Sequence, residues 1–270
     1  MSRRRPAWFG LVLGAALALT LVFLTVPVIA IFADTGPRQL LRSLGDASAT
    51  DALWLSLQTS LTAVLIIVLV GTPAAYALAT RRFRGREIVV TLIELPLVLP
   101  PAVAGIGLLA AVGPNGILGP ALQDAGIRFA LQTSSVVLAL VFVAAPFYLR
   151  QAQSAFEALD PDWLRASRTL GAGQAQTFLR IAIPAAAPGL VAGLALAWGR
   201  ALGEFGATLM FAGSFRGITQ TAPLAIYDRF STDFDGALAL SAVLVSVSAA
   251  LLLTVKLVTG SRWESAGAAR

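Results

Sequence analysis

The sequence RASRTLGAGQAQTFLRIAIP, Arg165–Pro184, is a polar stretch with its own helix signals, and it lies between two long apolar segments. The rest of the chain has the composition of a membrane protein. Its 270 residues are 57% hydrophobic and only 13% charged, and the mean hydropathy is +0.80. A single soluble core cannot hide so much apolar surface, so the composition indicates an integral membrane protein. The polar stretch is therefore expected in a loop outside the bilayer.

Cysteine and histidine are both absent from the chain. Their absence excludes thiol chemistry, disulfides, Cys/His metal sites and imidazole acid–base catalysis, and we predict no cofactor and no metal. The net charge is +6. The arginines nevertheless fall in the loops between apolar segments, where membrane topology places them, and not on a soluble face that would bind nucleic acid. We expect no nucleic-acid partner.

Six apolar segments are long enough to cross a bilayer, whose core of about 30 Å needs roughly 20 helical residues. The first follows Arg3-Arg4-Arg5 but runs well past the apolar region of a signal peptide, so we interpret it as a retained helix. The sequence predicts an all-α polytopic protein with one transmembrane domain over residues 1–270. The predicted spans are Trp8–Phe32, Leu53–Ala79, Ile88–Val112, Leu131–Tyr148, Ala185–Phe205 and Ala237–Leu257.

The orientation follows from the Lys and Arg residues of the loops, which favour the cytoplasmic side. If the N-terminus is cytoplasmic, the outer loops hold Arg38, Arg42, Arg128, Arg216 and Arg229. Fourteen basic residues then lie inside, so both termini and the loop 150–184 are predicted to be cytoplasmic. The inner set is Arg3, Arg4, Arg5, Arg81, Arg82, Arg84, Arg86, Arg150, Arg165, Arg168, Arg180, Lys256, Arg262 and Arg270.

The loop 150–184 contains signals for a short helix of its own. Asp160 followed by Pro161 is typical of a helix start, and Gly171 is suited to ending the helix in a left-handed conformation. Gln174–Ile183 predicts a second helical piece. The short helix either lies on the membrane surface or docks on another protein. Its narrow apolar face consists of Trp163, Ala166 and Leu170, and Arg165 and Arg168 point elsewhere.

This stretch resembles the cytoplasmic coupling loop of ABC importer permeases, whose usual form is E-A-A, three residues, Gly and a later Pro. Arg165 stands where that family usually has Glu, and Ser167 stands where it often has Ala. The resemblance implies that the loop docks in a cleft of a cytoplasmic ATP-binding subunit. The residues assigned to this coupling are Asp160, Trp163, Arg165, Ala166, Ser167, Leu170, Gly171, Ala172, Phe178 and Pro184.

Other segments resemble the molybdate permease branch of that family. They are LIELPLVLPPAVAG (92–105), VFVAAPFYLR (141–150), GRALGEFGATLMFAG (199–213) and GITQTAPLAIY (217–227). The resemblance implies a type I, MetI-like fold in the cell inner membrane. It also implies a second copy of the chain, ATP-binding subunits and an external oxyanion-binding protein as partners, with molybdate or tungstate in transit. Sulfate permeases are close relatives, so a sulfate or thiosulfate importer is the alternative.

Charged residues inside predicted spans are costly and are candidates for a functional role. Glu94 is either a gate or anchor between helices, or a residue near the cytoplasmic interface that reaches for Arg86 or water. Arg200 and Glu204 are four residues apart and predict an ion pair within the helix. The prolines of span three predict either a bend that lines the pathway or a static kink. These prolines are Pro96, Pro100 and Pro101.

The segment 206–235 is assigned outside the membrane although parts of it are apolar. Thr221 is suited to cap a short helix that begins near Ala222-Pro223. The segment is either part of the outer gate, where hydroxyl and amide groups bind an oxyanion, or a folded external loop with capped turns. The groups in question belong to Thr208, Thr219, Gln220 and Thr221.

Other function classes require features that the sequence does not offer. The chain lacks the G-x-x-x-x-G-K-[ST] phosphate loop, so an ATP-driven importer would obtain hydrolysis from a partner. An intramembrane enzyme would need a catalytic set, and the spans contain no Asp pair and no Ser beside an obvious base. An ATP-independent secondary transporter or channel would show inverted repeats or a row of polar residues, and neither is clear.

Overall fold

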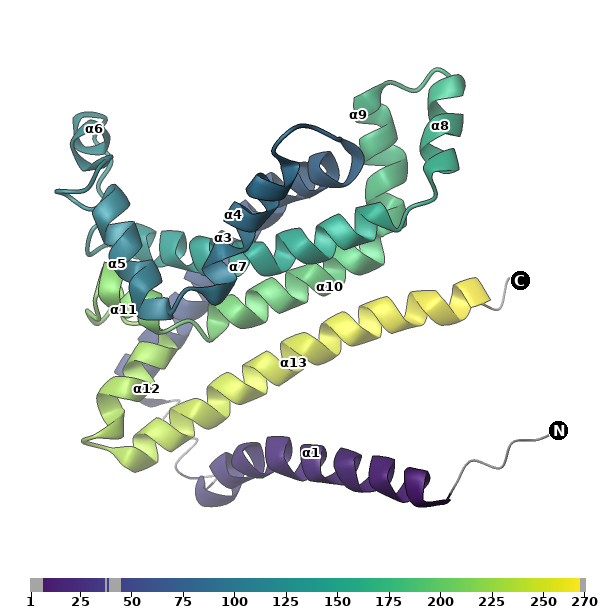
Figure 1. The fold of residues 1–270 in the computed structure, drawn as a ribbon. Helices are drawn as coiled ribbons and strands as arrows, with labels where there is room; N and C mark the ends of the chain where they lie inside the picture. Colours follow the sequence, from purple (N-terminus) through teal and green to yellow (C-terminus); the bar gives the residue numbers. More distant parts are fainter. Residues whose placement is uncertain (1–6, 37, 39–44, 268–270) are drawn as a thin grey trace.

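The computed structural model describes residues 7–36, 38 and 45–267, and in this part of the chain the regular elements are all helices. Arg3, Arg4, Arg5, Arg42 and Arg270, which enter the orientation argument, lie outside the described residues. The helices are α1 Ala7–Asp34, α3 Ala47–Thr80, α4 Arg86–Val98, α5 Pro101–Val112, α6 Gly119–Asp124, α7 Thr133–Glu157, α8 Pro161–Thr169, α9 Gln174–Thr177, the π-helix η1 Phe178–Ala182, α10 Ile183–Leu202, α11 Gly206–Ala212, α12 Ala222–Phe230 and α13 Phe234–Gly267 (Figure 1).

The prediction of an all-helical polytopic protein is confirmed. Among the described residues, five helices are long and apolar enough to cross a membrane, and the bent pair α4–α5 makes a sixth crossing if it is one span. The helices extend beyond several predicted spans. α7 continues to Glu157, past the predicted end at Tyr148. The polar residues after Tyr148 still form a helix, because the first helix-breaking signal after them is Asp160-Pro161. The assignment of residues 1–270 to one domain stays a prediction.

Span three is broken rather than continuous. α4 and α5 meet at 119°, with Leu99 and Pro100 between them in extended conformations at ψ 131° and 136°. Each of these two residues precedes a proline, and the ring of the following proline disfavours the helical conformation of the residue before it. Pro96 is accommodated inside α4. The consecutive prolines at 100 and 101 therefore locate the break.

α7 lies at the centre of the bundle, packed against α3 on one side and α10 on the other (Figure 1). Small residues allow close approach of these helices. A Cβ on Gly189 of α10 would lie 2.4 Å from the Cβ of Ala155 in α7. Tyr148, which is 1% exposed, fills the α3 side, where its hydroxyl lies 2.6 Å from Thr72 Oγ1. Alanine and glycine thus set the spacing, and a few large side chains fill the gaps.

The outermost helices are α13 and α1, and α1 lies against α13 (Figure 1). The apolar side chains of α1 are almost all exposed in the isolated chain, including Leu11 at 74% and Phe23 at 76%. A helix that is apolar all round and exposed in water is suited to contact with lipid or another membrane helix. α1 is therefore the part of the described chain most clearly built for a membrane environment.

Candidate functional site

The short helix of the loop 150–184 has both predicted ends. The Asp160 carboxylate accepts a hydrogen bond from the backbone N–H of Asp162 at 2.9 Å, and Pro161 is the first residue of α8. Gly171 has φ +86°, so it follows α8 in the left-handed conformation. The N–H groups of Gly171 and Ala172 donate to the carbonyls of Arg168 and Ser167, each at 3.0 Å. These two hydrogen bonds together form a Schellman motif, and they give α8 a sharply defined end.

α8 presents its apolar residues to the outside of the molecule. Trp163 and Leu170 are 55% and 88% exposed, and Ala166 is exposed between them. Arg165 is also exposed and forms an ion pair with Asp162 at 2.9 Å. Figure 1 shows that α8 projects from one end of the bundle, next to α9. The apolar face is thus free in the isolated chain, as a docking surface requires.

The opposite face of α8 is anchored to the rest of the chain. The Ser167 hydroxyl is buried and lies 2.8 Å from the Thr177 hydroxyl of α9. Phe178 comes next in the chain and packs on Tyr76 of α3 and Phe156 of α7, with ring centroids 4.8 and 6.3 Å away. The sequence analysis groups Ser167 and Phe178 with the docking residues. In the structure they instead contact α9, α3 and α7, and these contacts anchor the loop to the bundle.

Pro184 is exposed and lies just after the π turn, inside the helical run, where its missing N–H removes one backbone hydrogen bond. α9, η1 and α10 form one continuous helical run of 29 residues from Gln174 to Leu202. The predicted second helical piece is therefore confirmed as a helix, and it is joined to span five without a break. The π-helical turn at 178–182 was not predicted.

Span five ends at Leu202, earlier than the predicted Phe205, in a second break. The predicted ion pair forms: Arg200 Nη2 and Glu204 Oε2 are 2.6 Å apart, with the Glu204 side chain 1% exposed and that of Arg200 28% exposed. Glu204 lies beyond the end of α10, and its other carboxylate oxygen accepts the N–H of Ala207 at 2.7 Å. The carboxylate therefore caps α11 as well as pairing with Arg200, which explains the early end of the helix.

The breaks of spans three and five lie against each other. A Cβ on Gly206, the first residue of α11, would lie 2.7 Å from the Cβ of Pro101. A Cβ on Gly105 of α5 would lie 2.6 Å from the carbonyl oxygen of Ala207. Only glycine permits such backbone contact. The prolines and the Arg200–Glu204 pair, chosen separately from the sequence, thus belong to one pair of interlocked helix breaks at the end of the bundle away from α8 (Figure 1).

Glu94 belongs neither to the α8 docking surface nor to the two interlocked helix breaks. Its carboxylate lies 2.8 Å from Arg150 Nη1, so the pair connects α4 with α7. The expectation that Glu94 reaches for Arg86 is wrong. Arg86 instead binds Glu157 at 2.8 Å, because its position at the start of α4 directs it to the end of α7. Glu94 is therefore an anchor between helices in this conformation.

The segment 206–235, predicted to be external, contains two helices with buried faces, α11 and α12. Thr208 is buried in α11, which packs on α5 and α7. Thr219 Oγ1 accepts the N–H of Phe215 at 2.9 Å, and Gln220 Nε2 donates to Ser214 Oγ at 3.3 Å. These bonds shape the turn before α12 and occupy both polar side chains.

Thr221 stands at the predicted capping position of α12, but its side chain makes no capping bond. The hydroxyl of Ser56 in α3 takes that place and accepts the N–H of Ala222 at 2.7 Å. The hydroxyls of Thr208 and Thr221 are both buried and have no hydrogen-bond partner among the described residues. A buried hydroxyl without a partner is costly, which makes these two groups candidates for contact with a ligand.

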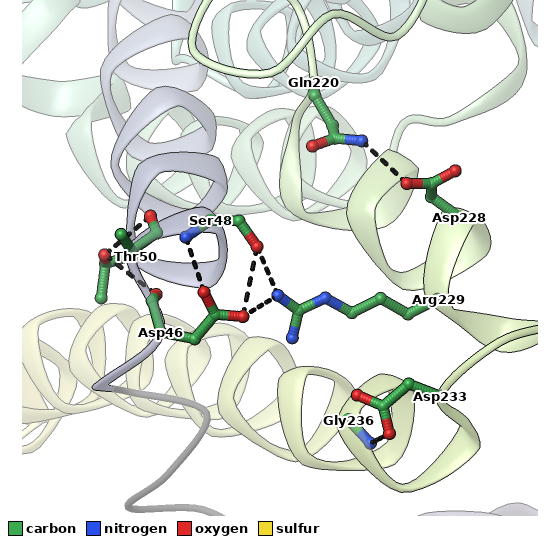
Figure 2. Close-up of polar contacts among 9 residues, drawn as sticks. Asp46, Ser48, Thr50, Gln220, Asp228, Arg229, Asp233 and Gly236 are labelled. Carbon is green, nitrogen blue, oxygen red and sulfur yellow. Dashed lines mark hydrogen bonds and ion pairs between the residues drawn. The ribbon is translucent and has the colours of Figure 1, made fainter.

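An ion-pair cluster joins α12 to the start of α3. Figure 2 shows Arg229 of α12 directed at Asp46 and Ser48, and its guanidinium binds both side chains. The N–H of Ser48 donates to the Asp46 carboxylate at 2.9 Å and, aided by Arg229, lowers the pKa of Asp46 below its ordinary value. Sequence reasoning missed this cluster. Asp46 before an apolar run is a recognisable capping signal, whereas nothing in the sequence pairs it with Arg229.

Ser56 was also missed, although a signal existed. Ser56, Thr59 and Ser60 recur at helical spacing within an apolar span, which indicates a face turned toward protein rather than lipid. In the structure all three are buried, and Ser60 accepts a hydrogen bond from Trp198 Nε1 at 3.0 Å. This polar face of α3 holds both α10 and α12.

Residues 67–260 match the family described as binding-protein-dependent transport system inner membrane component. The chain belongs to this family. Among its relatives in the permease family, the molybdenum transport system permease protein ModB of Mycobacterium bovis is 42% identical over 235 residues, which cover 87% of this chain and 89% of ModB. The sulfate transport system permease protein CysW of Synechococcus elongatus is 35% identical over 190 residues, covering 70% of this chain and 66% of CysW.

A solved structure supports the same fold for this permease-family chain. A bacterial ABC transporter involved in the import of the acidic polysaccharide alginate contains a chain that superposes with a TM-score of 0.73 at 18% identity, covering 93% of this chain and 95% of that one. At this identity the likeness concerns the fold alone. The MetI-like permease fold predicted from the sequence is confirmed.

Proposed function

We propose that the chain is the permease subunit of an ATP-driven importer for molybdate, with tungstate as a second cargo of the same shape and charge. The observation that carries this proposal is the match with ModB at 42% identity over 87% of the chain. The identity with the sulfate permease CysW is 35% over 70% of the chain, so sulfate is the second candidate. Catalysis of ATP hydrolysis is assigned to a separate ATP-binding subunit.

The coupling role is assigned to α8. Its ends are fixed by the Asp160 cap and the Gly171 motif, and its exposed apolar face includes Trp163 and Leu170. Such a face buries apolar surface when a cleft of the ATP-binding subunit receives it. Arg165 is paired within α8, so its contact with the partner is secondary to the apolar one. This docking end is cytoplasmic in the proposed orientation, and both termini lie on the same side.

The gating role is assigned to the two interlocked breaks. Non-helical backbone at membrane depth is tolerated where it is buried in protein or lines a water-filled path. The unpartnered hydroxyls of Thr208 and Thr221 are candidates for weak hydrogen bonds to the passing oxyanion. The carboxylate of Glu204 balances Arg200, so the break holds no net positive charge that would trap a dianion. High affinity is assigned to an external binding protein.

The permease is expected to work as a pair of copies, because six spans are few to enclose a path for an ion and a twofold interface provides one. The exposed apolar surface of α1 is consistent with burial against lipid or the second copy. Each copy then supplies one α8, and the pair receives two ATP-binding subunits.

The proposal is tested by ATP hydrolysis of the purified permease–ATPase complex in liposomes, with the binding protein loaded in turn with molybdate, tungstate or sulfate. We expect stimulation by molybdate and tungstate and little by sulfate. Equal or stronger stimulation by sulfate would retain the importer and change the cargo. Failure of any ATP-binding subunit to associate with the permease would contradict the importer itself.

A further inference from the structure

The segment RRFRGR, Arg81–Arg86, leads from α3 into the start of α4 and borders an open cavity of about 560 Å³. Arg81, Arg82, Phe83 and Arg86 line the cavity, and Glu87 and Glu157 complete its wall. Three guanidinium groups against two carboxylates leave the lining with a net positive charge, and Arg84 adds to it from the same loop. Neither the coupling role nor the gating role uses this basic cavity.

Arg86 gives the loop a fixed shape. Its Nε donates to the carbonyl of Leu78 at 2.9 Å, and its Nη atoms bind Glu157 at 2.8 Å and Glu87 at 3.2 Å. Gly85 has φ +85°, a left-handed conformation that makes the turn into α4 possible. One guanidinium is therefore shared by both carboxylates of the wall. The cavity is held open by bonds that connect the ends of α3, α4 and α7.

The other arginines of the loop are available for a ligand. Arg81, Arg82 and Arg84 are exposed, and their side chains form no ion pair with another described residue. A guanidinium fork matches the oxygens of a phosphate group and binds it through two parallel hydrogen bonds. Two of these free guanidinium groups, those of Arg81 and Arg82, line the cavity and thus form a site of the right chemistry for a phosphate ester.

The surroundings of the cavity point to a lipid as the source of that phosphate. Phe83 is 46% exposed within the arginine run, and the first turns of α4 expose Ile88 at 66% and Leu92 at 62%. The charge of the loop therefore borders directly on the apolar surface of a membrane-crossing segment. Basic pockets between transmembrane helices at the cytoplasmic surface bind anionic headgroups, and aromatic rings favour the same depth.

We propose that the Arg81–Arg86 cavity binds the phosphate-bearing headgroup of an anionic phospholipid, whose acyl chains lie along the exposed face of α4. The site depends on the membrane placement of α3 and α4 and is independent of the transported ion. A bound lipid would connect the ends of α3 and α7 near the loop that carries α8, so it would stabilise the end of the bundle where the ATP-binding subunit docks.

The test compares phosphatidylglycerol with phosphatidylcholine by native mass spectrometry of the delipidated permease–ATPase complex. The variant Arg81→Gln/Arg82→Gln should bind phosphatidylglycerol about 30-fold more weakly than the natural chain, since each arginine near an anionic surface contributes about fivefold. Arg81→Lys/Arg82→Lys keeps the charge but loses the guanidinium forks, so its binding should lie between that of the natural chain and that of the glutamine variant. The matched control Arg128→Gln/Arg216→Gln removes the same charge from exposed positions elsewhere and should leave the preference unchanged.

Several outcomes would overturn the site. The preference for phosphatidylglycerol could persist in the 81/82 glutamine variant. It could also fall equally in the 128/216 control, which would show that the preference depends only on the net charge of the chain. Glycerol 3-phosphate could bind as tightly as the lipid, which would make a soluble phosphate ester the ligand. Loss of the ATP-binding subunit with unchanged lipid preference would assign the loop to that subunit.

A second measurement needs no variant. Backbone hydrogen exchange of residues 81–86 in the natural complex should slow when phosphatidylglycerol is added and stay unchanged with phosphatidylcholine. Equal exchange in the two lipids would contradict the proposal even if the glutamine variant failed to assemble.

Discussion

Gly171 is the residue at which the docking hypothesis is most open to test. Its φ of +86° closes the Schellman motif of α8, and a Cβ placed on it would have nothing within 4 Å in this chain. A substitution therefore has only two effects. It strains the backbone, by about 1–2 kcal/mol for an ordinary residue in the left-handed region, and it adds a side chain to whatever surface receives α8.

Three substitutions separate these effects. Gly171→Ala carries the full strain, which corresponds to at most about a 30-fold weaker association with the ATP-binding subunit if the strain is borne by docking. Gly171→Asn tolerates the left-handed conformation and should lose less from strain. Gly171→Asp matches Asn in size and adds a negative charge at the C-terminal end of α8, where the helix dipole makes it unfavourable by about 0.3–1 kcal/mol, or at most about fivefold.

The assay is ATP-driven molybdate uptake in proteoliposomes, with the amount of copurified ATP-binding subunit measured in parallel. Gly171→Asp should insert normally and lose coupled uptake by more than fivefold relative to Gly171→Asn, because the excess reports a closely apposed partner. Gly173→Ala is the matched control, since Gly173 has φ −68° and open space around it. Unchanged uptake in Gly171→Asp would show that α8 is not the docking helix.

Three further predictions concern the breaks and the α3–α12 cluster. Arg200→Gln and Glu204→Gln should each lower the stability in detergent by about 2–3 kcal/mol, which is less than for a fully buried pair because Arg200 is 28% exposed. The double variant should lose less stability than the sum of the two single losses. Additive losses in thermal unfolding would contradict the pairing. Gly105→Ala should cost about 1–3 kcal/mol by overpacking against α11, whereas Gly107→Ala, with nothing within 4 Å of its Cβ, should cost little, and equal shifts in melting temperature would refute the close contact. Asp46 has a lowered pKa in the folded state, so its stabilising effect is present above its ordinary pKa and is lost as the pH falls through the lower folded value. Because the side chain is 43% exposed, the effect should be about 1 kcal/mol or less. Asp46→Asn should make the melting temperature less sensitive to acid, and an unchanged acid sensitivity would exclude the cluster as the cause of that sensitivity.

The parts of the fold that were predictable from the sequence are those decided by local chemistry. Apolar length predicts the spans, Asp160-Pro161 and Gly171 predict both ends of α8, and the i, i+4 spacing predicts the Arg200–Glu204 pair. Each of these depends on residues close together in the chain. Even the break of span three was indicated by its prolines, although the sequence left a static kink and a gating bend equally open.

The parts that were not predictable depend on contacts between distant segments. Whether Ser167 faces a partner or Thr177 depends on how the loop folds back, and its spacing alone cannot distinguish the two. The capping of α12 by Ser56 instead of Thr221 follows from the position of α3, which is 166 residues away in sequence. The meeting of the two helix breaks likewise requires glycines whose neighbours are unknown until the helices are placed.

The arrangement of these contacts suggests how docking reaches the gate. α8 is tied to α9 through the Ser167–Thr177 hydroxyl pair, and the helical run from Gln174 to Leu202 then spans 29 residues, or about 43 Å, to the break at Glu204. The only departure from α-helix in this run is the π turn at 178–182, which is braced by aromatic rings of α3 and α7. We infer that α8 and α10 move together, so that displacement of α8 by the ATP-binding subunits shifts the break directly. Spin-label distances between α8 and the Leu202 end of α10 should then stay constant during ATP turnover while distances from α8 to α5 change. A changing α8–α10 distance would instead place the hinge at the π turn.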